Sequence, residues 1–393
     1  MIDLLENENC TGCHACASVC PESCITMESD KEGFWYPNID KTKCVNCKLC
    51  EKACPVLSVH PVADGDTPAA YAAYNKDEKT RLDSSSGGVF SLLAEKIISD
   101  GGVVFGAAYN EKFDVEHIAV DTLDDIYKLR GSKYVQSKIG ESYKQAKRFL
   151  EAGRKVLFTG TPCQIAGLKS ILGKDFDNLY TQDLICHGVP SPLVWQKYVK
   201  FREKRSASST RRAFFRHKKY GWKTFSVLFE FSNNTEYMKS HGVDSYMTGF
   251  LRNWSLRSSC YNCHFKGLRR QADITLADFW GIENVCPELD DDKGTSLIVI
   301  HSEKGRKLLD SVSSHIVYKD VDLNTAKNWN PSIAVSVEKP RERAFFIRKL
   351  KNKDFEKYVT EVLRKNDLRY RGNLCKRLVR KAKNFLRRVL KSI

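Results

Sequence analysis

Eight of the fifteen cysteines form two identical runs near the start of the chain. The first run is Cys10-Thr-Gly-Cys13-His-Ala-Cys16-Ala-Ser-Val-Cys20-Pro21, and the second is Cys44-Val-Asn-Cys47-Lys-Leu-Cys50-Glu-Lys-Ala-Cys54-Pro55. Each reads C-x2-C-x2-C-x3-C-P, in which three closely spaced thiolates hold one iron–sulfur cubane and the fourth reaches a second cubane. The pattern therefore predicts two 4Fe–4S clusters, one on Cys10, Cys13, Cys16 and Cys54, the other on Cys44, Cys47, Cys50 and Cys20.

Two other uses of clustered cysteines fit this pattern less well. Zinc sites usually pair C-x2-C units across a longer gap and have no use for a third cysteine at the same spacing. A disulfide framework needs an oxidising compartment, whereas the acidic segment Met1 to Asn9 lacks the apolar core of a signal peptide. Cys24 lies outside both sets, and we interpret it as a buried thiol.

Four further cysteines are enough for a third cluster, but their spacing alone leaves that assignment open. Cys260 and Cys263 form a C-x2-C pair, whereas Cys163 and Cys186 each follow a predicted strand. Separated cysteines are as often buried core residues. Thr161 and Gln164 have capping-box spacing, which puts Cys163 in the first turn of a helix, where we expect the helix dipole to favour its thiolate. Cys286 and Cys375 have no such partners.

Three glycine-bearing stretches could cradle phosphates with backbone amides and hydroxyls. They are Ser84-Ser-Ser-Gly-Gly88, Gly131-Ser-Lys-Tyr134 and Gly160-Thr161. None matches the dinucleotide G-x-G-x-x-G pattern or the P-loop, so helix capping is the other interpretation. Three histidines, His14, His187 and His264, adjoin candidate ligands, and we expect them to form hydrogen bonds rather than to bind metal.

Basic residues account for a formal net charge of +16, and nine of them lie between Arg371 and Ile393, where no acidic residue occurs. Apolar residues recur there at helical spacing, which predicts a cationic amphipathic helix. Such a helix could attach to an anionic membrane surface or to a partner, which we favour. It could instead dock on the protein's own body or bind nucleic acid without sequence preference. A second basic set, Arg211, Arg212, Arg216, Lys218 and Lys219, could meet an anionic substrate or only form a charged face.

Short apolar strands and helices alternate from Tyr71 onward and predict a mixed α/β domain that positions these residues. We expect strands at 71–74, 103–105, 117–120, 155–159, 179–185, 274–277 and 297–300, and helices at 89–98, 140–152, 162–172 and from Pro192. Alternation at 225–231 predicts a half-exposed strand, and Phe34 to Pro37 a hairpin segment covering the clusters. Cys163 and Cys186 then follow strand ends, where sites of open α/β sheets lie.

The predicted domain order follows from these patterns. Residues 1–58 form a two-cluster, α+β ferredoxin-like module, 59–68 a linker, and 69–150 and 151–330 two parts of one mixed α/β domain, the second bearing the third-cluster cysteines. Residues 331–393 form a helical basic tail. No run approaches the roughly 20 apolar residues that cross a bilayer. We expect a cytoplasmic protein whose tail can attach it to the inner face of the membrane.

In this order the motifs resemble the family of beta subunits of coenzyme F420 (deazaflavin) hydrogenases and dehydrogenases, preceded by a two-cluster 4Fe–4S ferredoxin module. The resemblance covers residues 1–325. It rests on the cysteine runs and on Ser85-Ser-Gly-Gly88, Gly131-Ser-Lys-Tyr-Val-Gln136, Gly160-Thr-Pro-Cys-Gln164, Asp183-Leu-Ile-Cys-His-Gly188, Cys260-x2-Cys263 and Asp278-Phe-Trp-Gly281.

The resemblance implies an FAD-containing oxidoreductase whose α/β domain binds the flavin. A flavin can exchange hydride with a deazaflavin or another substrate and single electrons with clusters. By that likeness Cys163, Cys186, Cys260 and Cys263 hold a third 4Fe–4S cluster, and the FAD contacts are Ser86, Gly87, Gly88, Ser132, Lys133 and Thr161. Lys133 would stabilise anionic reduced flavin or be a solvated lysine. No catalytic residue is indicated.

The substrate and the partners stay open. Similar proteins reduce a chlorophyll intermediate, form part of formate dehydrogenases or accompany surface-polysaccharide enzymes, so the partner is a redox protein or a small molecule. The alternative function is a noncatalytic electron-transfer or scaffold subunit of a larger redox or membrane-surface complex. Bound FAD with turnover favours the enzyme, and clusters without flavin favour the noncatalytic role. Specific nucleic-acid binding is disfavoured, because the basic tail has few interleaved aromatic residues.

Overall fold

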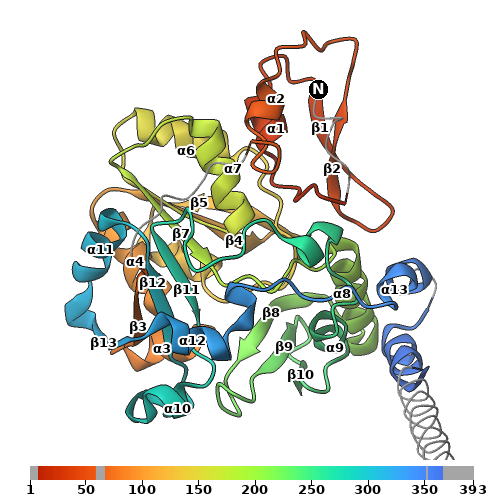
Figure 1. Ribbon diagram of the computed structural model, residues 1–393. Coiled ribbons are helices and arrows are strands. Elements are labelled where there is room, and N and C mark those ends of the chain that lie inside the picture. Colours follow the sequence, from red (N-terminus) through yellow and green to blue (C-terminus); the bar gives the residue numbers. More distant parts are fainter. Residues whose placement is uncertain (1–7, 59–66, 351–352, 366–393) are drawn as a thin grey trace, which may run out of the picture.

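The fold is built around a mixed eight-stranded sheet, in the order β13-β3-β12-β11-β7-β6-β4-β5 (Figure 1). The computed structural model describes residues 8–58, 67–350 and 353–365. The strands are β3 (Ala69–Asn75), β4 (Val103–Tyr109), β5 (Val115–Val120), β6 (Val156–Thr159), β7 (Leu179–Leu184), β11 (Ile274–Asp278), β12 (Ser296–Ile300) and β13 (Ile316–Val321). Both predicted parts of the α/β domain therefore contribute to one sheet.

The middle of the sheet is parallel, and its two sides are antiparallel. β4, β6, β7 and β11 run parallel, with Val103 opposite Val156 and Asp183 opposite Thr275. β5, β12, β3 and β13 pair antiparallel with their neighbours. The carboxyl ends of the central strands therefore lie at one edge, where the loops after β6, β7 and β11 meet.

Helices cover both faces of this sheet. α4 (Val89–Ser99) and α11 (Glu303–Asp310) pack with Leu157 on one face, whereas α6 (Ser142–Glu151) and α7 (Pro162–Leu172) pack with Phe158 on the other. Because successive strand residues point to opposite faces, the short apolar runs read in the sequence are buried on both sides. Shorter helices are α3 (Glu78–Asp83), α5 (Ile126–Leu129), α10 (Ile282–Val285) and α12 (Leu323–Trp329).

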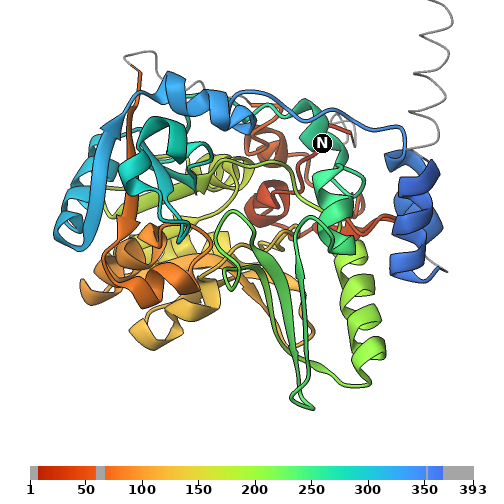
Figure 2. The same cartoon turned by 90° about the horizontal axis from the view of Figure 1, so that it is seen from below.

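A second sheet, β10-β9-β8, stands beside the first and projects with α8 to one side in Figure 2. It comprises β8 (Thr210–His217), β9 (Ser226–Phe231) and β10 (Glu236–Ser240), next to α8 (Pro192–Ser206) and α9 (Ser245–Leu251). The prediction of a half-exposed strand here is wrong, since Ser226 and Leu228 are buried as fully as Phe229. As the middle strand, β9 is covered on both faces, and its alternating sequence carries no sign of this.

The helical C-terminal region is divided differently from the prediction. α13 (Arg343–Leu350) and a helix over 355–365 pack into the core beside α8, where the ring of Phe355 lies 4.9 Å from that of Tyr198. Residues 343–350 and 355–365 therefore belong to the body rather than to a tail, because apolar side chains such as Phe346 are buried there. The basic segment 371–393 lies outside the described residues. Across the described part of the chain, no helix has the length and apolar character to span a bilayer.

The N-terminal module lies over α7 at one end of the sheet (Figure 1). It contains α1 (Ala15–Val19), α2 (Leu49–Lys52) and the hairpin β1 (Ile25–Ser29) with β2 (Trp35–Ile39). The hairpin is confirmed, but its Phe34 is fully buried in the large core of the body. Glu32 pairs with Arg343, and Leu193 packs against Gly33.

Arg257 is the central contact between module and body. Its side chain is fully buried, and its guanidinium donates to the carbonyls of Cys10 (2.7 Å) and Trp35 (3.0 Å) in the module and to Oε1 of Gln136 (3.2 Å) in the body. The same guanidinium stacks 4.2 Å from the ring of Tyr36. One side chain thus satisfies acceptors on both sides of the interface.

Replacing Arg257 should loosen the module. Arg257→Met leaves buried carbonyls without donors, at about 1–3 kcal/mol for each group. We expect the thermal midpoint to fall by several degrees and limited proteolysis to release the module. Arg211→Met, which removes an exposed arginine paired with Glu230 at 3.4 Å, is the matched control and should change neither. An Arg257→Met chain as stable as the control would show that the guanidinium does not hold the interface.

Candidate functional site

A large cavity opens at the carboxyl edge of the central strands and has a volume of about 600 Å³. Thr159, Leu184 and Asp278, at the ends of β6, β7 and β11, contribute to its wall. The loops that follow parallel strands converge at this edge, so residues distant in sequence meet there. The volume lies within the range of roughly 300–1,000 Å³ found for ligand and cofactor sites.

The three glycine-bearing stretches meet at this cavity. The first stretch leads into α4, the second follows α5 and the third follows β6. The backbone N–H of Ser132 donates to Oγ of Ser85 at 2.7 Å, which joins the first two. Their lining residues are Ser84, Ser85, Ser86, Gly88, Gly131, Ser132, Lys133, Tyr134, Gly160 and Thr161. The sequence could propose these stretches one by one, but only the fold brings them together.

Five of the six residues expected to contact FAD line the cavity, and Gly87 does not. The N–H of Gly87 donates to Oγ of Ser296 at 3.0 Å, and a Cβ at Gly87 would lie 2.4 Å from the carbonyl oxygen of Ala73. Gly87 therefore lets the loop approach strands β3 and β12 closely. It supports the cavity wall from behind.

Lys133 is neither a solvated lysine nor free to donate to a ligand. Its ammonium donates to the carbonyls of Lys128, Leu129 and Arg130, each at 3.0 Å, and so closes the C-terminal end of α5. Burial lowers the pKa of this ammonium to about 7. Its hydrogen bonds thus hold the second loop in shape, and the alkyl chain faces the cavity.

The opposite side of the cavity is aromatic, which sequence reasoning missed. Trp280 stacks on Trp222 with ring centroids 4.8 Å apart, and Asp278 accepts from Nε1 of Trp222 at 3.0 Å. Phe225 and His241 stack at 4.2 Å on the same side. The Asp-Phe-Trp-Gly motif pointed to this region, but nothing in the sequence linked it to Trp222, Phe225 and His241, which lie in the connections next to β8, β9 and β10.

The second basic set does not act as a unit. Arg216 is buried at the cavity, where it pairs with both oxygens of Asp278 and donates to the hydroxyl of Tyr134 at 3.1 Å. Lys218 donates to three backbone carbonyls, and burial lowers its pKa to about 7. Arg211 and Arg212 are exposed and lie near Glu230. Only Arg216 lines the cavity, and its charge is matched by Asp278.

The four cysteines proposed for a third cluster converge on one small cavity beside the large one. Cys163 begins α7, Cys186 follows β7, and Cys260 and Cys263 lie on a 3-10 turn and just after it. The N–H of Val189 donates to Sγ of Cys260, and the N–H of Phe265 donates to Sγ of Cys263, each at 3.4 Å. Such N–H···S contacts are usual around iron–sulfur clusters.

Burial governs the protonation of these thiols. Desolvation raises the pKa of Cys163, and the charges of Cys263 and Cys186 raise it further. Burial also raises the pKa of Cys260 to about 12 and that of Cys186 to about 11. The expectation that the helix terminus would favour the Cys163 thiolate is therefore wrong for the thiols by themselves. A positive group such as iron would favour the thiolates here.

The loop 186–189 separates the two cavities and lines both. Its His187 bonds through Nε2 to Oδ1 of Asn253 at 2.7 Å, and burial lowers its pKa. Thr161 lines the large cavity, and Cys163, two residues later, lines the small one. The start of α7 therefore also lies between the two cavities. A group in one cavity is therefore separated from a group in the other by a single layer of chain.

The two N-terminal cysteine runs fold alike. In each, the residue before the second cysteine and the residue after it are left-handed: Gly12 and His14 in the first run, Asn46 and Lys48 in the second. These two steps turn the chain back on itself, as wrapping a small cube requires. Glycine and asparagine accept that conformation most readily.

The folded runs group the cysteines in the predicted sets. Cys10, Cys13, Cys16 and Cys54 are all buried. Burial is the main cause that raises the pKa of Cys13 to about 12, and the charges of Cys10 and Cys54 add to it. Cys20, Cys44, Cys47 and Cys50 line a separate cavity. Within the described residues no group of His, Cys, Asp or Glu is close enough to hold a single metal ion.

The remaining candidate ligands differ in their surroundings. Cys24 is a buried thiol, as expected, but its sulfur lies 3.3 Å from that of Cys20, at the second group. His14 is buried and His264 is exposed, and neither joins a group of metal ligands among the described side chains. Cys286 is buried in the body, apart from all three groups.

Comparison with known proteins adds the family context. Residues 9–57 match the sequence model of the 4Fe–4S dicluster domain. Residues 70–143 and 153–325 match the N-terminal and C-terminal models described as coenzyme F420 hydrogenase/dehydrogenase, beta subunit.

Individual relatives are distant. The chain is 23% identical over 334 residues to a coenzyme F420-dependent sulfite reductase of Methanocaldococcus jannaschii, covering 79% of this chain and 47% of that protein. It is 22% identical over 171 residues to one of the subunits of the F(420)H(2) dehydrogenase of Methanosarcina mazei, covering 41% and 48%. A solved chain of the F420-reducing [NiFe] hydrogenase complex from Methanosarcina barkeri aligns with a TM-score of 0.47 at 16% identity. The alignment covers 68% of this chain and 89% of that chain. The matches span about half the length of these two curated relatives.

The contact between α7 and the module can be tested at Gly167. A Cβ there would lie 3.0 Å from the hydroxyl of Tyr143 and 3.3 Å from Sγ of Cys13. We expect Gly167→Ala to displace Cys13, to destabilise the chain by about 1–3 kcal/mol and to alter the EPR signal of the reduced module. Gly242→Ala, at a glycine with no atom within 4 Å, is the control. Identical spectra and stability for both variants would contradict this contact.

Proposed function

Because this chain belongs to the family of coenzyme F420 hydrogenase/dehydrogenase beta subunits, we propose that it is an iron–sulfur flavoprotein oxidoreductase. In this proposal electrons pass between 4Fe–4S clusters, FAD and a hydride-accepting substrate. The observation that carries it is the single loop, 186–189, which lines both the large cavity and the four-cysteine cavity. A two-electron carrier and a one-electron carrier could exchange electrons across that loop.

The large cavity fits an extended cofactor with a phosphate-bearing half and a planar half. The serine–glycine loops bring hydroxyls and backbone amides to its lining, and Trp280 and Phe225 bring aromatic rings. Ser86, Gly88, Ser132 and Thr161 would hold the phosphates, whereas Gly87 and Lys133 would keep the loops in shape. When bound, FAD supplies the conversion between hydride and single-electron transfer.

The residues of the small cavity suit an anionic cluster. A 4Fe–4S cluster with four thiolates carries net negative charge, and two cations lie beside it: Lys266, which is partly buried, and Arg270, which is buried 3.4 Å from Asp183. Lys266 donates to the carbonyl of Cys186, and Arg270 donates to that of Leu184 at 2.8 Å. These fixed charges would offset the charge of the cluster in a site that excludes water.

The substrate is proposed as a deazaflavin-type or another hydride acceptor. The names of the relatives favour a deazaflavin, but their own lengths are only half covered by this chain. If the substrate is not a deazaflavin, we propose that the reaction is linked to surface-polysaccharide synthesis. The basic segment 371–393 would then bring the protein to the inner face of the membrane.

The alternative is a noncatalytic electron-transfer or scaffold subunit of a larger complex. It is favoured if the chain binds clusters but no flavin. Anaerobic purification with iron, sulfide and flavin quantitation separates the two. About twelve irons and one FAD per chain support the enzyme. About eight irons per chain without flavin would contradict the enzyme proposal and favour the noncatalytic subunit.

Flavin binding can be tested with two matched glycines. Gly131 and Gly153 both have a positive φ, 84° and 78°, and neither has an atom within 4 Å of the place of a Cβ. Only Gly131 lines the cavity. We expect Gly131→Asp to lose flavin at least tenfold, because a carboxylate repels phosphates, and Gly153→Asp to keep it. Equal flavin content in both would contradict the assigned phosphate side.

The third cluster can be tested with one cysteine of the small cavity and one cysteine outside it. Cys163→Ala should lower the iron content by about four per chain and remove one EPR component. Cys286→Ala is the control, because Cys286 is 2% exposed and lies outside the cysteine groups. If both variants keep the iron content of the parent chain, Cys163 is not a cluster ligand.

A further inference from the structure

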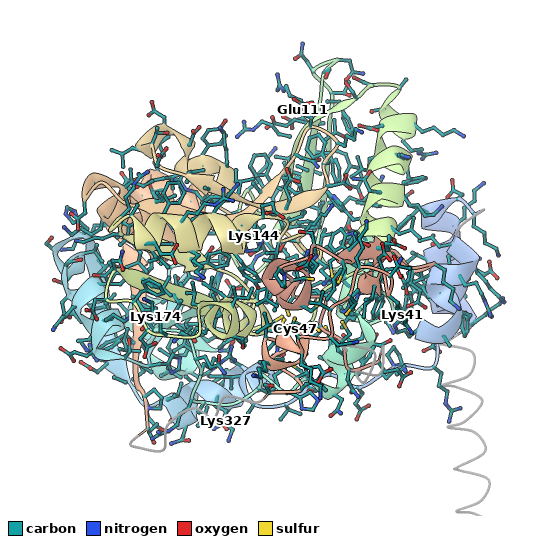
Figure 3. All side chains as sticks on the ribbon, turned by 90° about the horizontal axis from the view of Figure 1, so that it is seen from above. Lys41, Cys47, Glu111, Lys144, Lys174 and Lys327 are labelled. Atoms are coloured by element: carbon teal, nitrogen blue, oxygen red, sulfur yellow. The ribbon has the colours of Figure 1, made fainter. Side chains whose placement is uncertain are left out.

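The two cysteine groups of the module differ in their access to solvent. In the first group, Cys10, Cys13, Cys16 and Cys54 are each at most 8% exposed. In the second group Cys47 is exposed, and Figure 3 shows it on the outer face of the module. The four cysteines of the small cavity are partly buried, so Cys47 is the most exposed of the proposed ligands, and a cluster in the second group would have the most direct access to solvent.

A continuous series of contacts leads from the large cavity to that surface. The loop 186–189 joins the large cavity to the small one, and Cys163 begins α7 on the far side of the small cavity. One turn along α7, Gly167 lies against Cys13 of the first group. Helix α1 carries Cys16 of the first group and ends just before Cys20 of the second. Electrons from the buried cavity therefore have a path that ends at Cys47.

The surface around Cys47 is apolar at its centre and basic around it. Val45 is 62% exposed and Leu49 is 37% exposed, although both flank predicted ligands. Residues 41–52 carry four lysines against one acid, Glu51, a net charge of +3. The lysines are Lys41, Lys43, Lys48 and Lys52, all exposed. We call residues 41–52 the outlet surface.

We propose that the outlet surface is the docking site of an acidic one-electron carrier protein. Basic residues around an exposed apolar centre suit a partner whose own cofactor lies within an acidic rim. Complementary charge speeds the encounter, and the apolar centre brings the two cofactors close. One electron leaves the reduced carrier and one cluster gains it, with no bond made or broken. The inference rests on the proposed clusters of the module and does not require flavin or a substrate.

The test is stopped-flow reduction of the anaerobic full-length chain by reduced flavodoxin, an acidic carrier, observed at the cluster absorbance. In Lys41→Glu/Lys52→Glu the outlet surface changes by four charges. We expect the second-order rate constant to fall at least about tenfold at low ionic strength, and the difference to shrink near 1 M salt. Lys174→Glu/Lys307→Glu, with two exposed lysines elsewhere, is the matched control and should keep the parent rate.

A second reductant and iron analysis keep the outcomes apart. Reduction by dithionite should proceed at the parent rate in both variants, with equal iron content and EPR spectra. Equal flavodoxin rates for the outlet variant and its control would overturn the proposal, as would an equal loss with dithionite. Vesicles of phosphatidylglycerol test a membrane contact. If they bind the parent chain but not the outlet variant, and if they prevent reduction by flavodoxin, the outlet surface contacts a membrane instead of a carrier protein, which overturns the proposal. A chain without iron fails the proposed function itself.

Discussion

The buried guanidinium of Arg257 fixes the distance between the N-terminal module and the body. It has no carboxylate partner among the described residues, and its donors are directed at two module carbonyls and one body amide. Gln136 adds a bond in the opposite direction, from its amide to the carbonyl of Thr11 at 3.1 Å. Because an unsatisfied buried donor or acceptor is costly, these groups act as one unit. Electron transfer falls off steeply with distance, so a fixed interface matters for function as well as for stability.

Helix α7 is the second element on which this arrangement depends. Its first turn carries Cys163, and Gln164 closes the capping box with Thr161. One turn further, Gly167 has no side chain, so Cys13 of the module can approach the helix backbone. A single helix thus supports a wall of the large cavity, a thiol of the small cavity and the contact with the first cysteine group.

Buried charge explains much of the chemistry around the cavities. Arg216 is neutralised by Asp278. Lys133, Lys218 and Lys266 donate to backbone carbonyls that the surrounding loops would otherwise leave without partners. Lys266 and Arg270 lower the pKa of Cys186 only in part, since burial and repulsion between the thiolates still raise the pKa values of Cys163, Cys186 and Cys260. In this fold, iron is the cation that would balance them, which is why the proposed clusters and the buried cysteines belong together.

The sequence by itself determined the cysteine runs, their ferredoxin fold, the capping box of α7 and most strands of the large sheet. These features depend on local spacing, which the chain records directly. Only the tertiary structure decided that three glycine-bearing loops share one cavity and that Cys163, Cys186, Cys260 and Cys263 converge. It also decided that both faces of β9 are covered and that residues 343–350 and 355–365 belong to the body. Arg257 gave no signal at all, because an isolated arginine has no periodicity or spacing, and its partners lie 121 to 247 positions away. Contacts across such separations depend on packing of the whole chain, which no local pattern encodes.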